Sequence, residues 1–221
     1  MPRIWGVIFL VSTVAWGHAQ ASKSVPVAPR QASPPAFLPP PREAFVSVAE
    51  QKLVVMENGK KIAAFPVSTS KFGLGDRHGS WTTPLGVMHV ARKIGDRVPS
   101  GTVFRRRVPT REILRPNAPG RDPIVTRILW LGGNEPDNRN AYKRFIYIHG
   151  TPEERNIGKP ASFGCIRMKS ADVIAVYEML PVGSRITVVR EKVKKALTMV
   201  AMARLQPSKT YAAVTGAKRD E

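Results

Sequence analysis

The sequence predicts a mainly β domain, a sandwich or barrel-like fold, with one helix near its C-terminal end. Short runs of apolar and β-branched residues recur between residues 44 and 189, and glycine and proline turn signals separate them. One stretch near residue 170 has apolar residues at helical spacing instead. A chain of 221 residues with 43% hydrophobic content can bury one core of ordinary size, so we expect one domain with flanking tails.

Strands are predicted in order along this domain. It opens with a strand at 45–48 and then a hairpin, because Asn58-Gly59 lies between two apolar runs at 52–56 and 61–65. Apolar alternation and flanking glycines predict further strands at 86–90, 128–131, 145–149 and 185–189. Residues 91–128 are left without assigned elements.

The single predicted helix follows the only cysteine of the chain. Ser170 is a suitable N-cap, and Val173, Tyr177 and Leu180 have the i, i+4, i+7 spacing of a half-buried helix. Pro181 ends this helix, because proline cannot continue it.

The first 21 residues have the parts of a secretory signal peptide. A charged start at Met1-Pro2-Arg3 is followed by an apolar run at 4–16 and by Ala19-Gln20-Ala21, after which we expect cleavage. A membrane anchor is the alternative, although the apolar run is shorter than the ~20 residues that span a bilayer. Residues 22–43 are proline-rich and predict a stiff linker. We therefore expect an exported protein of the periplasm or cell envelope.

Cys165 is the candidate for chemistry, because an exported chain that keeps one unpaired cysteine favours a reactive thiol. A free cysteine of pKa ~8.5 is little ionised near neutrality and needs a base. His149, 16 positions earlier at the end of a predicted strand, can supply one. Gly164 permits a turn that leaves amide groups uncovered for an oxyanion. The alternatives are a buried structural cysteine and a structural histidine.

At these residues the sequence resembles the L,D-transpeptidase (YkuD-type) catalytic domain. His149 followed by Ser162-Phe163-Gly164-Cys165 is similar to the signature of that family, and Thr83-Pro84-Leu85-Gly86 is similar to a second segment of it. The resemblance covers about residues 44–189. Phe163 stands where the family usually has histidine.

The resemblance implies a role for each residue around the thiol. Cys165 would be the nucleophile and His149 its base, with the carbonyl of Gly150 orienting the imidazole. Amides near Gly164 and Cys165 would hold the oxyanion. Substrate contacts are expected from the side chains of Tyr147, Ser162, Phe163 and Arg167, although Arg167 could equally brace the loop.

The implied activity is a peptidoglycan L,D-transpeptidase. Its thiol would form a thioester with a tetrapeptide stem and transfer the stem to an amine, in cell-wall cross-linking or remodelling. With water as acceptor the same site would be an L,D-carboxypeptidase, and loss of chemistry through Phe163 would leave a wall-binding protein. We expect no metal, no organic cofactor and a monomer.

The net charge of +19 raises nucleic-acid binding as a rival function. The signal segment and the scattered aromatic residues, only 7% of the chain, argue against it, so we expect no nucleic-acid partner. A metal site is a weaker rival, because His78, His89, His149 and Cys165 lack the close spacing of zinc ligands.

Two basic segments have no assigned chemistry. Residues 190–221 form a basic C-terminal tail whose first part permits an amphipathic helix that could lie on an anionic wall polymer or membrane surface. The arginines between 91 and 128 could meet carboxylates of a peptide stem or wall polymer, or form a solvated basic face.

Overall fold

The computed structural model describes residues 42–205. The predicted signal peptide, nearly all of the predicted linker and the end of the predicted tail lie outside the described residues. Within residues 42–205, no helix is both long and apolar enough to cross a membrane.

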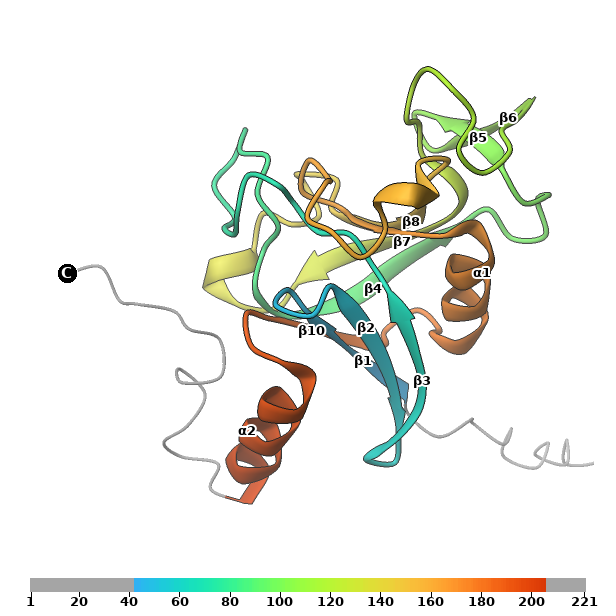
Figure 1. Cartoon of the computed structure of the whole chain (residues 1–221). Coiled ribbons are helices and arrows are strands. Elements are labelled where there is room, and N and C mark those ends of the chain that lie inside the picture. Colours follow the sequence, from blue (N-terminus) through green and yellow to red (C-terminus); the bar gives the residue numbers. More distant parts are fainter. Residues whose placement is uncertain (1–41, 206–221) are drawn as a thin grey trace, which may run out of the picture. The chain divides into compact units, whose positions relative to one another are not determined.

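The described chain is mainly β, which confirms the predicted fold class (Figure 1). Its strands are β1 (Arg42–Ser47), β2 (Lys52–Glu57), β3 (Lys60–Pro66), β4 (Gly86–Ile94), β5 (Thr102–Arg105), β6 (Val108–Ile113), β7 (Val125–Gly133), β8 (Tyr147–Gly150), β9 (Ile166–Met168) and β10 (Arg185–Val189). The helices are α1 (Ser170–Met179) and α2 (Val193–Leu205), and short 3₁₀ turns occupy Pro136–Asn138 and Glu154–Asn156.

The strands form one branched sheet with β7 at the branch. Its main path runs β3-β2-β1-β10-β4-β7-β5-β6, while β8 pairs with β7 and β9 pairs with β8. Strand β7 is buried along almost its whole length, and it pairs with β4, β5 and β8. The strand that carries the predicted histidine is therefore anchored on a long, largely buried strand of the sheet.

Every predicted strand is present, with shifts of a few residues at the ends. The segment left unassigned, 91–128, contains the β5–β6 hairpin, which projects beyond β7 and β8 in Figure 1. The predicted N-cap of the first helix is wrong by one position, since Lys169 occupies it. The hydroxyl of Ser170 instead lies 2.8 Å from that of Thr126, and its amide donates to Glu154.

The main hydrophobic core lies between α1 and the sheet. Val173, Val176 and Tyr177 on one side of α1 pack with Leu129 of β7 and Ile148 of β8. Fully burying an aliphatic side chain stabilises the fold by ~1.5–3 kcal/mol, so this cluster fixes α1 and β8 against each other.

A second helix follows α1, in the part of the tail where the sequence permits an amphipathic helix. Helix α2 lies within the predicted basic tail, and its Val193, Leu197 and Val200 pack on a small core of Phe45, Val54 and Met56 from β1 and β2. The apolar face of this helix is therefore covered by the sheet and is not free to enter a membrane. Its exposed lysines still face solvent, and binding of an anionic surface stays a prediction.

We predict that Leu197→Ala lowers the free energy of unfolding by about 1–2 kcal/mol, less than a fully buried leucine because this one is partly exposed. Met202→Ala on the same helix is the control, since its side chain is 60% exposed and should change stability by less than about 0.5 kcal/mol. Urea unfolding followed by circular dichroism measures both. Equal effects would mean that α2 does not dock on the sheet.

Candidate active site

The parallel pairing of β8 and β9 brings the predicted histidine and cysteine together. In this pairing Ile148 lies opposite Ile166 and His149 opposite Arg167, so Cys165, the residue before β9, lies beside Tyr147. Because side chains alternate across a strand, both isoleucines enter the main core. His149 and Cys165 therefore share the other face of the sheet.

The sulfur of Cys165 is half-buried and held by backbone groups of the preceding strand. The amide N–H of Tyr147 donates to Sγ at 3.4 Å, and the thiol donates to the carbonyl of Phe145 at 3.3 Å. Cys165 also packs against a small core that contains Trp130. Burial raises the pKa of the Cys165 thiol to about 11, so the thiol is protonated at neutral pH.

His149 is buried, and its ring is fixed by its own neighbour. Nδ1 lies 2.8 Å from the carbonyl oxygen of Gly150, the contact that the resemblance implied. A carbonyl can only accept, so Nδ1 carries the proton and Nε2 is left as the basic nitrogen. Burial lowers the pKa of His149 to about 4. The imidazole is therefore neutral at pH 7 and able to accept a proton.

The loop before the thiol is closed by its own hydrogen bonds. Gly164 has φ +118°, a conformation that favours glycine, as the predicted turn requires. Its amide donates to Oγ of Ser162 at 3.3 Å, so the expectation that this amide is uncovered is wrong in this arrangement. Ser162 is fully buried, and its hydroxyl donates to the carbonyl of Cys165 at 2.5 Å. Ser162 thus braces the loop and does not face a substrate, contrary to expectation.

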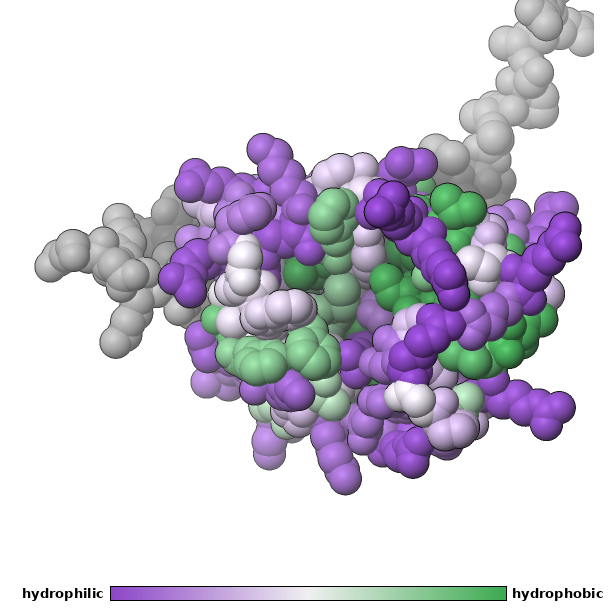
Figure 2. Space-filling model, turned by 90° about the horizontal axis from the view of Figure 1, so that it is seen from above, coloured by the Kyte–Doolittle hydropathy of each residue, from purple (hydrophilic) through white to green (hydrophobic). Residues whose placement is uncertain are grey.

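Phe163, unlike the buried Ser162, has its side chain at the surface. Its side chain is 48% exposed, and its ring centroid lies 5.4 Å from that of Trp81 and 5.5 Å from that of Phe72. Figure 2, a view from above, shows hydrophobic side chains among projecting hydrophilic ones. The residue that departs from the family signature thus belongs to an exposed aromatic cluster next to the thiol loop.

Arg167 and Tyr147, from which substrate contacts are predicted, are largely buried. The guanidinium of Arg167 is 9% exposed and lies 2.8 Å from the carboxylate of Asp122. Its positive charge lowers the pKa of His149 and that of Cys165, although burial has the larger effect on each. Tyr147 is buried, and its ring packs edge-on against that of Trp130.

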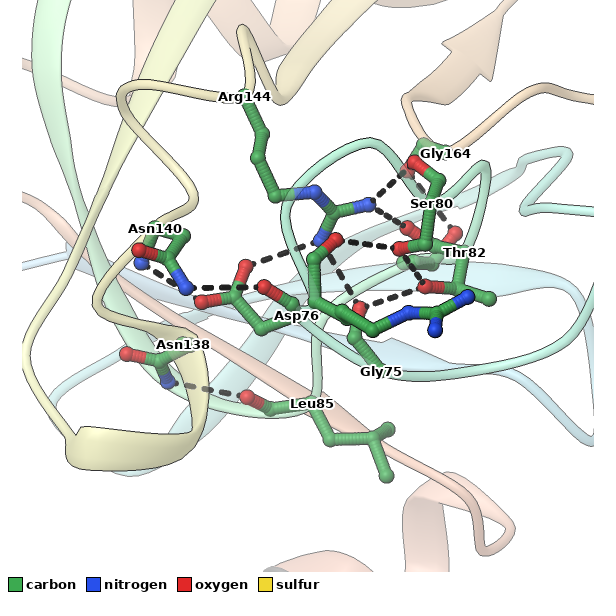
Figure 3. A network of polar contacts seen from close by, with 11 residues as sticks. Gly75, Asp76, Ser80, Thr82, Leu85, Asn138, Asn140, Arg144 and Gly164 are labelled. Carbon is green, nitrogen blue, oxygen red and sulfur yellow. Dashed lines mark hydrogen bonds and ion pairs between the residues drawn. The ribbon is translucent and has the colours of Figure 1, made fainter.

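A buried ion pair that the sequence does not predict holds the loop between β3 and β4. Arg144 and Asp76 approach to 2.9 Å, with side chains only 4% and 6% exposed. Figure 3 shows Arg144 reaching across to this loop, where it donates to the carbonyl oxygens of Gly75, Ser80 and Thr82. Nothing in the sequence distinguished this arginine from the many surface ones.

The loop between β3 and β4 contacts the loop that precedes Cys165 directly. Oγ1 of Thr83, in the segment that resembles the family, donates to the carbonyl of Gly164 at 2.9 Å. A Cβ at Gly164 would lie 3.2 Å from the carbonyl oxygen of Thr82. The ion pair of Arg144 and Asp76 therefore fixes the wall against which Gly164 and Cys165 are positioned.

Among residues 42–205, no group of three or more histidine, cysteine, aspartate or glutamate side chains could hold a metal ion. His89, one of the histidines considered for such a site, has Nδ1 2.6 Å from the side-chain oxygen of Asn134.

Comparison with known proteins finds matches to L,D-transpeptidases. The family model of the L,D-transpeptidase catalytic domain, YkuD, matches residues 41–188. The Bacillus subtilis protein named "Putative L,D-transpeptidase YqjB" is 37% identical over 67 residues, which is 30% of this chain and 35% of that protein. "Probable L,D-transpeptidase YcfS" of Escherichia coli is 28% identical over 162 residues, 70% of this chain and 46% of that protein.

The chain thus spans less than half the length of these curated relatives. Among solved structures, an L,D-transpeptidase from Mycobacterium smegmatis matches with a TM-score of 0.43 and 15% identity, over 66% of this chain and 58% of that one.

We predict that Arg144→Met lowers the free energy of unfolding by about 3–5 kcal/mol, because it leaves the buried carboxylate of Asp76 without its partner. The matched control is Arg121→Met, which breaks an exposed ion pair with Glu112 and should cost less than about 1 kcal/mol. Denaturant unfolding measures both. An Arg144→Met protein as stable as the control would show that the ion pair does not hold the loop.

Proposed function

The chain belongs to the L,D-transpeptidase catalytic domain family, and on that premise we propose that it is a peptidoglycan L,D-transpeptidase with Cys165 as nucleophile. The observation that carries the proposal is the register of β8 and β9, which sets His149 and a half-exposed thiol on one face of the sheet. A cysteine of purely structural use would be expected to lie wholly within a core.

In this proposal Sγ attacks the amide carbonyl on the C-terminal side of the diamino acid in a tetrapeptide stem. Nε2 of His149 takes the thiol proton as the carbon–sulfur bond forms. The same nitrogen returns the proton to the amine of the departing D-alanine as the carbon–nitrogen bond breaks. A thioester is left on Cys165, and an acceptor amine attacks it to release the transferred peptide.

The resting charges decide how the thiol is activated. Both groups are neutral, with pKa values shifted to about 11 for Cys165 and about 4 for His149. A free thiolate is therefore scarce, and deprotonation has to accompany attack on the carbonyl. The thiol must also turn from the carbonyl of Phe145 toward the imidazole, since its hydrogen bond points to Phe145 at rest.

Backbone amides next to the sulfur are suited to the oxyanion. With the amide of Gly164 bonded to Ser162, we assign this role to the amide of Cys165 itself, aided by that of Tyr147, which already faces the sulfur. Aligned donors of this kind are worth ~10²–10³ in rate.

The acceptor and the setting complete the proposal. An amine acceptor makes the reaction a cross-link or a remodelling step, and water would make it an L,D-carboxypeptidase. Since members of this family act on peptidoglycan, we assign the protein to the periplasm or cell envelope. Its charge of +19 suits anionic wall polymers, and this partnership and a monomeric state are further predictions.

We predict that a carbapenem acylates the parent protein once, with a mass increase equal to the whole drug, and leaves Cys165→Ala unmodified. The thiol is the only one in the chain, so intact mass spectrometry identifies the site without digestion. Circular dichroism confirms that the variant is folded. A parent that stays unmodified, or an alanine variant that gains the same mass, contradicts the assignment.

The rate of this acylation should depend little on pH between about 5 and 9. His149, with its pKa lowered to about 4, keeps its basic form until the pH falls through that value. Cys165, with its pKa raised to about 11, gives no rise near the ~8.5 of a free thiol.

His149→Ala should slow acylation by about 10²–10⁴ and make its rate rise with hydroxide concentration. Stopped-flow measurement across the pH range follows both proteins. An alanine variant with the rate and pH profile of the parent removes His149 from the mechanism.

A further inference from the structure

Arg107 is a half-buried cation that projects from the tip of the β5–β6 hairpin onto an aromatic wall. Its guanidinium carbon lies 5.1 Å from the ring centroid of Trp130 and 5.0 Å from that of Phe145. The ring of Tyr147 packs edge-on against the same Trp130, with the ring centroids 5.5 Å apart. The ring of Tyr142 stacks on Trp130 at 4.1 Å, almost parallel, and extends the wall.

Within residues 42–205 this guanidinium has no carboxylate partner. The acidic side chain of the same hairpin, Glu112, is taken by Arg105 and by Arg121. Aromatic faces stabilise a cation only partly, so a half-buried guanidinium in this setting favours an added anion. Two other arginines, Arg144 and Arg167, have charges that lower the pKa of the thiol. Unlike Arg107, each has a carboxylate partner, Asp76 for Arg144 and Asp122 for Arg167.

The backbone at the hairpin tip has a conformation that arginine does not favour. Arg106 and Arg107 form a two-residue turn between Arg105 and its partner Val108, with φ values of +50° and +70°. Turns with two positive φ values favour Asn-Gly, because other residues are strained there. This turn favours arginine at neither position, and of the two only Arg107 places its guanidinium on aromatic rings.

Arg107 is separated from the thiol by a single residue. Tyr147 donates its amide to Sγ of Cys165, and its ring packs against Trp130, on which the guanidinium of Arg107 lies. Phe145, whose ring lies under the guanidinium, accepts the thiol hydrogen bond through its carbonyl. A ligand group held by Arg107 would thus belong to the molecule that the thiol attacks.

We propose that Arg107 binds a carboxylate of the acyl donor and thereby selects acidic stem peptides, an inference that rests on the function proposed above. Its planar fork can hold a carboxylate through two parallel hydrogen bonds. Two carboxylates of the donor qualify: that of the terminal D-alanine and that on the side chain of a diamino dicarboxylic acid.

The test combines matched variants with matched donors. Arg107→Asn and Arg106→Asn remove one charge each from the same turn, and asparagine tolerates positive φ, so both variants should fold. The donors are a tetrapeptide with both carboxylates, one with the side-chain carboxylate amidated and one with the C-terminal carboxylate amidated. Mass spectrometry of donor consumption gives kcat/KM for every pair.

We expect Arg107→Asn to lower kcat/KM for the fully acidic donor about 10- to 100-fold, the usual worth of a charge-assisted hydrogen bond. Arg106→Asn should leave it unchanged. The loss should vanish with one of the two amidated donors, and that donor identifies the carboxylate, because a partner already removed cannot be lost again.

Carbapenem acylation of the parent separates this inference from the proposed function. If no carbapenem acylates the parent, the result contradicts the proposed function itself. With acylation intact, the inference about Arg107 is overturned by equal losses on all three donors, by no loss on any, or by a parent that consumes none of the peptides. An Arg106→Asn loss as large as that of Arg107→Asn would also overturn it, because the effect would then be one of general charge.

Discussion

The hydrogen-bonded register between β8 and β9 is the constraint on which the candidate site depends. A slip of one residue would turn His149 into the core and bring Ile148 to the reactive face. The slip is prevented because Ile148, Ile166 and Met168 are all fully buried in the main core. The packing that stabilises the domain and the geometry that could perform chemistry are therefore set by the same pairing.

Around this register, buried polar contacts fix positions that hydrophobic packing alone leaves free. The pair of Arg144 and Asp76 holds one loop, and the pair of Arg167 and Asp122 holds the strand that follows the thiol. Both arginines have charges that oppose the effect of burial on the thiol pKa, yet burial prevails. The structure thus supplies positive charge near the sulfur without ionising it at rest.

Much of this arrangement could be predicted from residue patterns, because local periodicity determines strands. The strands at 52–56 and 185–189 follow directly from apolar alternation and turn signals, as do the position of His149 at a strand end and the glycine before Cys165. What could not be predicted depends on long-range partners. The burial of Ser162, the bonded amide of Gly164 and the docking of α2 each need coordinates of a distant segment.

The basic residues show the same limit most clearly. The sequence contains 35 lysines and arginines, and no local feature separates Arg144 from Arg107 or from a solvated side chain. Only the fold shows that Arg144 faces a buried carboxylate and Arg107 faces aromatic rings. The surroundings of each arginine in the fold, and not its residue type, determine what its guanidinium contacts.

The protonated resting state of the half-buried Cys165 thiol also bears on its resistance to oxidation. Hydrogen peroxide and disulfides react with the thiolate, and a pKa near 11 leaves about 10⁻⁴ of the sulfur in that form at pH 7, against a few per cent for an ordinary cysteine. The chain contains no second cysteine, so an oxidised Cys165 would have no internal thiol to reduce it. A thiol that stays protonated at rest resists oxidation until a reaction partner draws its proton away.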